Sequence, residues 1–425
     1  MGDRGDGCVR GEAVVDLARE IGFPLVGVVP AEPVSVDDES RLREWLAGGE
    51  HGEMGYLAET VEARVDPRRV LEGARSMVVV GEQYWRRNED AVFREGGDER
   101  SRLKSGRGAL AGVVRWADYH RKLKKRLFGL CDAMRGRWGE RLATADDPAG
   151  REGFRAVVDT APVMERAHAR RAGIGWVGKH TLMIHPRRGS YLFLGVVLTR
   201  LEIGKPKNQR ETPDRCGTCA RCIEACPTGA ITPYSVDATK CVSYLTIEHR
   251  SEIDEGWYEG MGGWVFGCDV CQEVCPHNSP RTGRGGLVSA REEYGPFGGG
   301  AGGRTADGAG FDLLSVLGWT EEDRRAAFER SALKRASLAM MKRNALIAAG
   351  NAVTSGCGEE LACRLRSRMA ALASDEGEEE LVRATARRVL VRLGGVWVGG
   401  LGVFGLFFWP KKGLAGSGFG RIVWG

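Results

Sequence analysis

Two cysteine-rich stretches decide how this chain folds: CGTCARCIEACP at 216–227 and CDVCQEVCP at 268–276. The first is a C-x2-C-x2-C-x3-C-P run, whose spacing gives three thiolates to one 4Fe–4S cluster and sends the fourth to another cluster. A lone Cys241 lies between the stretches, and the second stretch repeats the Cys-Pro ending. The spacing therefore predicts a bacterial-type ferredoxin domain that holds two 4Fe–4S clusters.

The same spacing divides eight thiolates between the two clusters. The predicted ligands are Cys216, Cys219, Cys222 and Cys275 for the first cluster, and Cys226, Cys241, Cys268 and Cys271 for the second. Each cluster then draws ligands from both stretches. We therefore expect crossed ligation to join the two halves of the domain and to place two redox centres side by side.

Structural zinc is the alternative interpretation of paired C-x2-C motifs. Zinc requires neither a third cysteine at the same spacing nor the Cys-Pro ending, so the pattern favours iron–sulfur clusters. A disulfide framework is disfavoured because the thiols are concentrated in one stretch of a 425-residue chain. The other four cysteines have no ligand spacing and are expected to be ordinary thiols: Cys8, Cys131, Cys357 and Cys363.

Composition indicates a globular protein with two or three domains, since 42% of the residues are hydrophobic and 28% are charged. The net charge of +5 is too modest to indicate a nucleic-acid binder by itself. The N-terminal stretch MGDRGDGCVRGEAV has no apolar core and no twin-arginine pair, so export is not expected. Cysteine ligands must also stay reduced. Together these features predict a cytoplasmic protein.

The chain is predicted to be an α+β protein of several parts. Four apolar strands are expected at 24–29, 76–81, 154–159 and 191–199, with helical pattern between them. Further on, two amphipathic helices with basic sides, at 332–349 and 380–393, suggest a stacked, HEAT-like module. The expected divisions are an α/β domain at 1–205, the cysteine domain at 206–285, a glycine-rich linker at 286–310, the helical module at 311–394, and an apolar tail of unknown role at 395–425.

Three neighbouring stretches resemble epoxyqueuosine reductase: VDTAPVMERAHARRAGIGWVGKHTLMI at 158–184, CVSYLTIEHR at 241–250, and GWVFGCDVCQEVCPHN at 263–278. The likeness runs over roughly residues 10–394. It implies a nitroreductase-like N-terminal domain that binds cobalamin, and two clusters that pass electrons to it. The implied reaction reduces epoxyqueuosine to queuosine at the wobble position of tRNA. Two electrons and two protons remove the epoxide oxygen as water and leave a cyclopentene.

The resemblance also implies particular site residues. Asp159 matches the family's proposed proton donor, a role that a carboxylic acid fills only if its pKa rises toward neutrality. The alternative is a structural aspartate in a turn. The residues implied to contact cobalamin are Arg64, Arg115, Asp159, Lys179, Met183, Leu194, Ser243 and Asp269.

Two positions depart from the family pattern. The family usually has an arginine–tyrosine–alanine stretch and a short spacer before aspartate–tyrosine–histidine, whereas this chain reads RWADYH at 115–120 with the spacer shortened, which weakens the roles implied for Arg115, Asp118, Tyr119 and His120. His180 stands where the family more often has asparagine.

The predicted partners are the anticodon stem-loop of tRNA and an external low-potential electron donor, with no membrane, for a monomeric protein. The basic residues expected to meet phosphates are Lys334, Arg335, Lys342 and Arg343, with a second cluster at 121–126. Rival interpretations are a cobalamin-dependent reductive dehalogenase, a two-cluster electron-transfer protein, and an RNA-binding scaffold with structural zinc.

Overall fold

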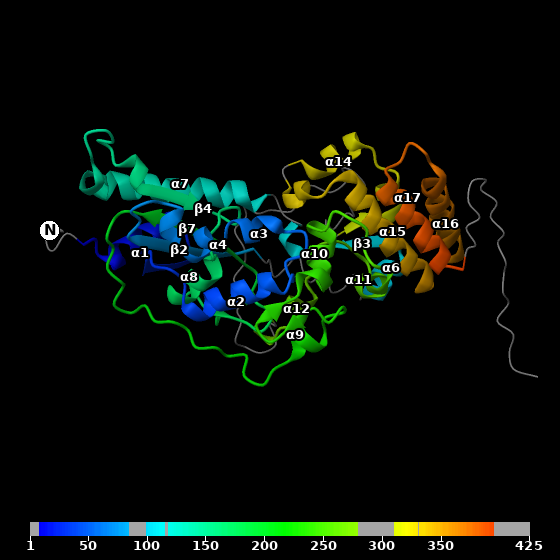
Figure 1. The fold of residues 1–425 in the computed structure, drawn as a ribbon, viewed down its shortest axis with the longest axis horizontal. Coiled ribbons are helices and arrows are strands. Elements are labelled where there is room, and N and C mark those ends of the chain that lie inside the picture. Colours follow the sequence, from blue (N-terminus) through cyan, green and yellow to red (C-terminus); the bar gives the residue numbers. More distant parts are fainter. Residues whose placement is uncertain (1–7, 85–98, 115–117, 279–309, 330, 395–425) are drawn as a thin grey trace, which may run out of the picture.

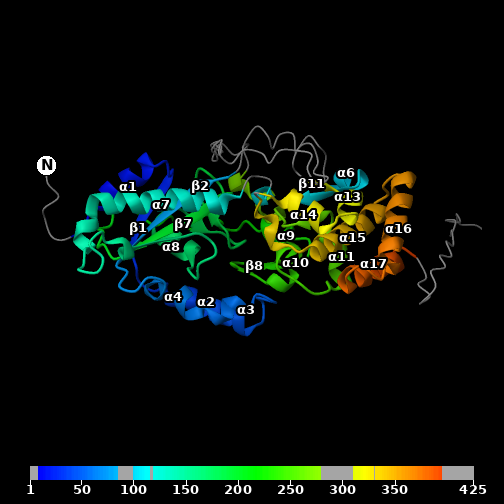
Figure 2. The same ribbon diagram turned by 90° about the horizontal axis from the view of Figure 1, so that it is seen from above.

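The computed structural model describes residues 8–84, 99–114, 118–278, 310–329 and 331–394 of the chain. The α+β structure is elongated, with a four-stranded sheet toward one end and stacked helices toward the other (Figure 1). The cysteine-rich segment lies between these two parts (Figure 2). None of the helices in the described ranges combines the length and apolar character needed to cross a bilayer.

The N-terminal sheet has the strand order β1-β2-β7-β4 and is antiparallel throughout. Its strands are β1 (Leu25–Pro30), β2 (Ser76–Gln83), β4 (Phe154–Val157) and β7 (Leu192–Thr199). Val78 and Val80 of β2 belong to one core cluster, while Met77 and Val79 belong to another. Because side chains alternate along a strand, β2 is buried on both faces of the sheet.

Helices cover both faces of this sheet. They are α1 (Gly11–Glu20) and α7 (Tyr119–Trp138) on the face of Val78, and α8 (Glu165–Arg171) on the face of Val79. Leu123, Leu127 and Leu130 form the buried stripe of α7, as their helical spacing predicts. Because this sheet is antiparallel throughout, the N-terminal region is α+β rather than the expected α/β.

Smaller elements complete the N-terminal region. They are α2 (Val36–Ala47), α3 (Gly55–Glu59), α4 (Val61–Val65), β5 (Trp176–Val177) and β6 (Met183–Ile184). Val61 and Val65 of α4 pack with Ala167 of α8 in a separate apolar cluster. This packing fixes α4 beside the segment that follows β4.

The cysteine-rich segment is built from short elements joined by loops. They are α9 (Arg221–Glu224), β8 (Ile231–Thr232), β9 (Ser235–Val236), α10 (Val242–Ile247), α11 (Tyr258–Met261), β10 (Trp264–Phe266) and α12 (Val270–Glu273). Lys179 ties the segment to the N-terminal region, because its Nζ donates to the carbonyl oxygens of Gly217 (2.7 Å) and Cys219 (3.0 Å).

A second sheet joins segments that are far apart in the chain. Strand β3 (Arg107–Leu110) pairs in parallel with β10 and antiparallel with β11 (Gly310–Asp312). The region at 99–114, placed in the N-terminal domain by the sequence, therefore packs with the cysteine-rich segment and the C-terminal helices. The domain boundaries stay a prediction, but this region does not follow them.

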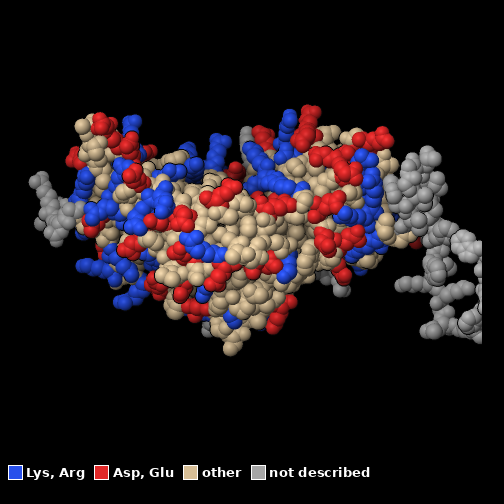
Figure 3. All heavy atoms as spheres, in the orientation of Figure 1, with Lys and Arg blue, Asp and Glu red and all other residues tan. Residues whose placement is uncertain are grey.

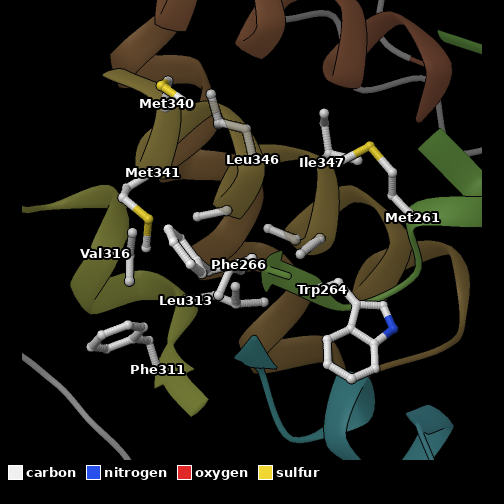
Figure 4. Packing of buried hydrophobic residues seen from close by; sticks show 14 of the residues in the cluster. Met261, Trp264, Phe266, Phe311, Leu313, Val316, Met340, Met341, Leu346 and Ile347 are labelled. Atoms are coloured by element: carbon white, nitrogen blue, oxygen red, sulfur yellow. The ribbon is translucent and has the colours of Figure 1, made fainter. Parts of the chain in front are cut away.

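The C-terminal helices surround the largest core of the molecule. They are α13 (Leu313–Leu317), α14 (Glu321–Phe328), α15 (Leu338–Thr354), α16 (Glu359–Ser374) and α17 (Glu380–Arg392), with α6 (Glu99–Lys104) beside them. Figure 4 shows Met341 and Leu346 of α15 gathered with Phe266 of β10 and Leu313 of α13. The core thus unites α15 with the strand that precedes the second cysteine stretch.

The predicted helix at 332–349 is interrupted. A 3-10 turn at Ala332–Arg335 is followed by α15, whose N-cap Ser337 accepts a hydrogen bond from the Met340 N–H (3.2 Å). A serine side chain satisfies the first N–H groups of a helix and so favours a new start. The predicted linker, apart from Gly310, and the predicted tail lie outside the described residues.

Candidate functional site

The eight cysteines lie near one another in the folded chain. Cys216, Cys219 and Cys222 all affect the pKa of Cys275. Cys226, Cys241 and Cys222 affect the pKa of Cys271, and Cys241 and Cys271 affect that of Cys268. No three His, Cys, Asp or Glu side chains in the described part are close enough to bind a single metal ion. The division of the eight thiolates between two clusters therefore stays a prediction.

Burial disfavours the ionised form of these thiols. Burial raises the pKa of Cys275 to about 11, and it raises the pKa values of Cys241, Cys268 and Cys271 as well. Cysteine binds metal as thiolate, and a bound metal supplies the positive charge that stabilises the deprotonated form. A set of buried, mutually repelling thiols therefore fits a metal cluster better than it fits free cysteine.

Two donors point at the sulfur atoms. The Ala230 N–H donates to Cys226 Sγ at 3.3 Å. Trp176 is 1% exposed and packs with Cys216 and Cys275, and it acts to lower the pKa of Cys216, which burial raises. Its Nε1 makes no hydrogen bond within the described part of the chain, so the indole N–H is available to a cluster sulfur. Donors of this kind are expected beside cluster sulfurs, and Trp176 was not predicted from the sequence.

Asp159 lies two residues beyond β4, where the strand has ended at Val157. Its backbone φ is 50°, in the left-handed region that residues other than glycine occupy infrequently. Strained backbone of this type persists where surrounding contacts hold it. The side chain is 43% exposed, although desolvation heads the influences on its pKa. The Asp159 side chain is thus partly exposed, with protein groups close around its carboxylate.

Two cationic side chains contact the Asp159 carboxylate. His120 Nε2 lies 3.0 Å from Asp159 Oδ2, and Arg335 Nη2 donates to the same oxygen at 2.7 Å. Burial alone would raise the pKa of Asp159, but these two partners lower it below its ordinary value. The raised pKa expected of a proton donor is therefore absent in this arrangement, and the proton must be held nearby.

His120 is placed to hold that proton. Its Nδ1 lies 2.9 Å from Asp118 Oδ1, while its Nε2 faces Asp159. Burial would lower the pKa of His120, but hydrogen bonds to the two carboxylates raise it to about 9. Asp118 is also the N-cap of α7, where it accepts from the His120 N–H at 3.0 Å. Asp118 and His120, whose roles the shortened spacer put in question, therefore lie together at the site.

This ion-paired imidazole predicts a pH-dependent stability. The folded pKa of about 9 exceeds the ordinary 6.5, so the stabilisation is full below pH 6.5 and is lost as the pH rises through about 9. We expect the interaction to contribute about 1–3 kcal/mol. Melting temperatures across this range should fall more steeply for the wild type than for His120→Gln. Parallel curves for the two proteins would contradict the assignment.

Glu165, at the start of α8, is a second acid that the sequence did not single out. Burial raises the pKa of the Glu165 side chain to about 7, although hydrogen bonds with the backbone of Glu165 itself and of Asp159 act to lower it. Its Oε1 has no hydrogen-bond partner among the described residues. Neighbouring Arg166 is exposed, although desolvation lowers its pKa, and its Nη1 donates to the Thr181 carbonyl oxygen at 2.5 Å.

Arg64 and Tyr56 lie together near Asp159. Arg64 Nε donates to Thr60 Oγ1 at 3.0 Å, and its guanidinium lies 5.9 Å from the centre of the Tyr56 ring. The charge of Asp159 affects the pKa values of both Arg64 and Tyr56. Tyr119 lies nearby and stacks on His120 with a centroid distance of 3.9 Å. The site therefore brings acids, cations and aromatic rings together around Asp159.

The other predicted cofactor residues are distributed around this site. Met183 is buried in β6, and Leu194 is partly buried in β7. Ser243 follows Cys241, and the buried Asp269 accepts a hydrogen bond from the Gly112 N–H while influencing the pKa of Cys271. Arg115 lies outside the described residues. Their contacts with a cofactor stay predictions.

The predicted phosphate contacts need correction at two positions. Arg343 is 0% exposed and donates to the carbonyl oxygens of Leu245 (2.7 Å) and Ser251 (2.6 Å). Lys342 is 6% exposed and forms an ion pair with Glu378. Both side chains belong to a helix buried on nearly all sides, so neither is available to a phosphate.

Lys334 remains exposed and can meet an anion. Arg121, Lys124 and Lys125 are exposed on α7. Figure 3 shows Lys and Arg side chains along the edge of the molecule over α7 and toward α14. Arg126 is different, because it pairs with the buried Glu82. This edge is the basic surface nearest Asp159, since Lys334 influences the pKa of Asp118.

Comparisons with protein families match two regions of the chain. The model described as "4Fe-4S double cluster binding domain" matches residues 215–278. The model described as "Epoxyqueuosine reductase QueG, DUF1730" matches residues 64–160. Together they cover the paired cysteine stretches and the segment that carries Asp159.

Curated relatives extend the likeness over most of the chain. Epoxyqueuosine reductase from Leadbetterella byssophila is 34% identical over 332 residues, which span 77% of this chain and 94% of the relative. Epoxyqueuosine reductase from Xanthomonas campestris is 39% identical over 266 residues, which span 62% of this chain and 68% of the relative.

Solved structures share the fold. The crystal structure of an epoxyqueuosine reductase with an epoxyqueuosine-modified tRNA-Tyr stem loop has a TM-score of 0.70 at 23% identity, covering 90% of each chain. Epoxyqueuosine reductase from Streptococcus thermophilus has a TM-score of 0.65 at 23% identity, covering 90% of this chain and 99% of the other.

Proposed function

Because this chain belongs to the epoxyqueuosine reductase family, we propose that it reduces epoxyqueuosine to queuosine in tRNA. The chain is thus an oxidoreductase whose double-cluster domain holds two 4Fe–4S clusters. The observation that carries the proposal is that one chain combines the double-cluster cysteine segment with an Asp159 carboxylate held by His120 and Arg335.

The proposed redox apparatus consists of the two clusters and cobalamin. The clusters would transfer single electrons, and cobalamin would supply a low-valent cobalt centre able to attack an epoxide. The residues present fit a polar cofactor, because Arg64 is partly buried and Glu165 Oε1 lacks a hydrogen-bond partner among the described residues. The proposed contacts remain Arg64, Arg115, Asp159, Lys179, Met183, Leu194, Ser243 and Asp269.

Residues of this chain would store the protons and deliver them to the substrate. Opening an epoxide leaves an alkoxide, which needs an acid within hydrogen-bonding distance. We propose that Asp159 delivers the proton and that His120, at 3.0 Å, stores it on Nε2. His120 keeps its proton at neutral pH, since its pKa is raised to about 9. Glu165, with its pKa raised to about 7, is placed to supply a second proton.

The tRNA would lie along the basic edge, with the modified base turned out of the loop toward Asp159. Single-stranded bases are recognised in this splayed form, while phosphates are held by Lys and Arg. The proposed phosphate contacts are Lys334 and the basic face of α7, with Arg335 considered separately below.

Charge reversal at Lys334 tests this surface. We expect Lys334→Glu to weaken tRNA binding and to reduce the slope of log affinity against log salt by about one or more. The measurement is a binding titration across a salt series. Arg364→Glu, an exposed change on α16, is the matched control. Equal affinities and slopes for both variants would remove Lys334 from the interface.

The finer architecture also belongs to the proposal. We infer a nitroreductase-like cobalamin domain from the helix-covered antiparallel sheet, and a HEAT-like module from the stacked α15, α16 and α17. The proposed protein is a monomer that receives electrons from an external low-potential donor. Its ligand thiols must stay reduced, which supports a cytoplasmic location.

The test of the proposed function is turnover under anaerobic conditions. Protein loaded with iron, sulfide and cobalamin, given a strong reductant, should convert epoxyqueuosine to queuosine in a tRNA stem-loop. The same material should leave a halogenated phenol unchanged. The reverse preference would identify a reductive dehalogenase instead.

A further inference from the structure

Arg335 reaches from the C-terminal helical module into the site around Asp159. Its guanidinium bridges two carboxylates, with Nη2 2.7 Å from Asp159 Oδ2 and Nη1 3.0 Å from Glu248 Oε1. Asp159 follows the N-terminal sheet, and Glu248 follows α10 of the cysteine-rich segment. One side chain therefore links all three parts of the molecule at the proposed proton donor.

The position of Arg335 is built into the packing of the module. Leu333 and Ala336 on either side of it are both 0% exposed. The Arg335 carbonyl oxygen accepts from Arg250 Nη1 at 2.9 Å, and the Ala336 carbonyl oxygen accepts from Arg324 Nε at 2.8 Å. A backbone anchored at these points presents the guanidinium in one direction, toward Asp159. A phosphate contact at the surface would not need this arrangement.

Several ionisable groups surround Asp159 besides Arg335. They are Tyr56 from α3, Arg64 from α4, Asp118, Tyr119 and His120 at the start of α7, Glu165 and Arg166 from α8, Glu248 after α10, and Lys334 from the same turn as Arg335. In the described part, only His120 and Arg335 are seen to contact the Asp159 carboxylate. Losing Arg335 thus removes one of two partners that hold a strained residue.

We propose that Arg335 is a positioning residue for the reaction, which holds the Asp159 carboxylate against His120 from the helical module. The proposal rests on the proposed function, in which Asp159 delivers a proton. It makes the helical module a part of the reaction site in addition to a surface for RNA. It also replaces the prediction that Arg335 contacts phosphate.

Two consequences follow for the reaction. Without Arg335 the carboxylate is free to move, and a displacement of about 1 Å from the productive geometry costs roughly 100-fold in rate. Loss of a cation beside the His120–Asp159 pair also makes both groups hold their protons to higher pH. The alkaline limb of the pH–rate profile should therefore move to higher pH.

The experiment compares holoenzyme variants in kcat, in KM for the modified tRNA and in pH profile. Arg335→Gln should lower kcat roughly 10- to 100-fold and shift the alkaline limb upward, with less change in KM. Arg335→Lys should recover part of kcat, because it keeps the charge but lacks the fork that bridges two carboxylates. Arg325→Gln removes an exposed charge from α14 as the control.

The outcomes separate the inference from the proposed function. An Arg335→Gln variant with wild-type kcat and a raised KM would show a phosphate contact and overturn the inference alone. A fall in kcat without any shift of the pH profile in either variant would show a merely structural role and overturn it too. If Arg335→Gln fails to fold, Arg335→Lys is judged on kcat and KM alone: a lowered kcat at unchanged KM supports the inference, and a wild-type kcat with a raised KM overturns it. Wild-type protein that never reduces epoxyqueuosine would overturn both.

Discussion

Asp159→Asn is expected to lower the turnover of epoxyqueuosine in tRNA by roughly 10²- to 10⁴-fold, the usual contribution of a positioned acid. Asparagine has nearly the same shape but cannot pass a proton from His120 to an alkoxide. Folding should survive, because asparagine tolerates the positive φ of 50° at this position and the side chain is 43% exposed. The measurement is product formation by mass spectrometry under single-turnover conditions.

The matched control is Asp146→Asn, which alters an exposed aspartate in a loop of the same region. Iron content, cobalamin binding and melting temperature should be unchanged in both variants. Near-wild-type turnover by Asp159→Asn would show that the proton comes from another group, of which Glu165 is the first candidate because its pKa is raised to about 7.

Double cysteine variants are expected to differ sharply in iron content, according to which clusters lose a ligand. Crossed ligation predicts that Cys216→Ala and Cys275→Ala remove the same cluster, so the double variant keeps about four of about eight irons. Cys268→Ala combined with Cys275→Ala should remove a ligand from each cluster and lose nearly all of the iron. Both double variants should lose turnover, because the relay of electrons is broken.

Iron and sulfide analysis of anaerobically purified protein measures this difference. Cys363→Ala is the control, since its thiol is exposed and far in sequence from the ligand stretches. If each cluster instead took its ligands from one stretch, the order of the two double variants would be reversed. Equal iron contents in the two double variants would also contradict crossed ligation.

Local patterns in the sequence predicted much of this molecule. The valine run at 76–81 identified β2, because a strand buried on both faces has little room for polar residues. The cysteine spacing identified the double-cluster domain, because cluster ligands recur at characteristic separations in the chain. Asp159 was identified through the likeness of its motif to a known family rather than through any local pattern.

Contacts between residues far apart in the chain could not be predicted from such local patterns. Arg335 and Asp159 are 176 residues apart, and no periodicity connects them. The β3–β10–β11 sheet likewise joins segments from three predicted domains. The burial of Arg343 could have been predicted from the sequence, because α15 is apolar on nearly every side. Charges within such a helix are buried and paired rather than displayed to a ligand.

Metal analysis of the wild-type chain, purified without oxygen, tests the central claim most directly. Two cross-ligated 4Fe–4S clusters predict about eight irons and about eight acid-labile sulfides per chain, with little zinc. The reduced protein should also give electron paramagnetic resonance signals of two magnetically interacting clusters. Stoichiometric zinc with little iron or sulfide would contradict the account, because the site beside Asp159 would then have no source of electrons.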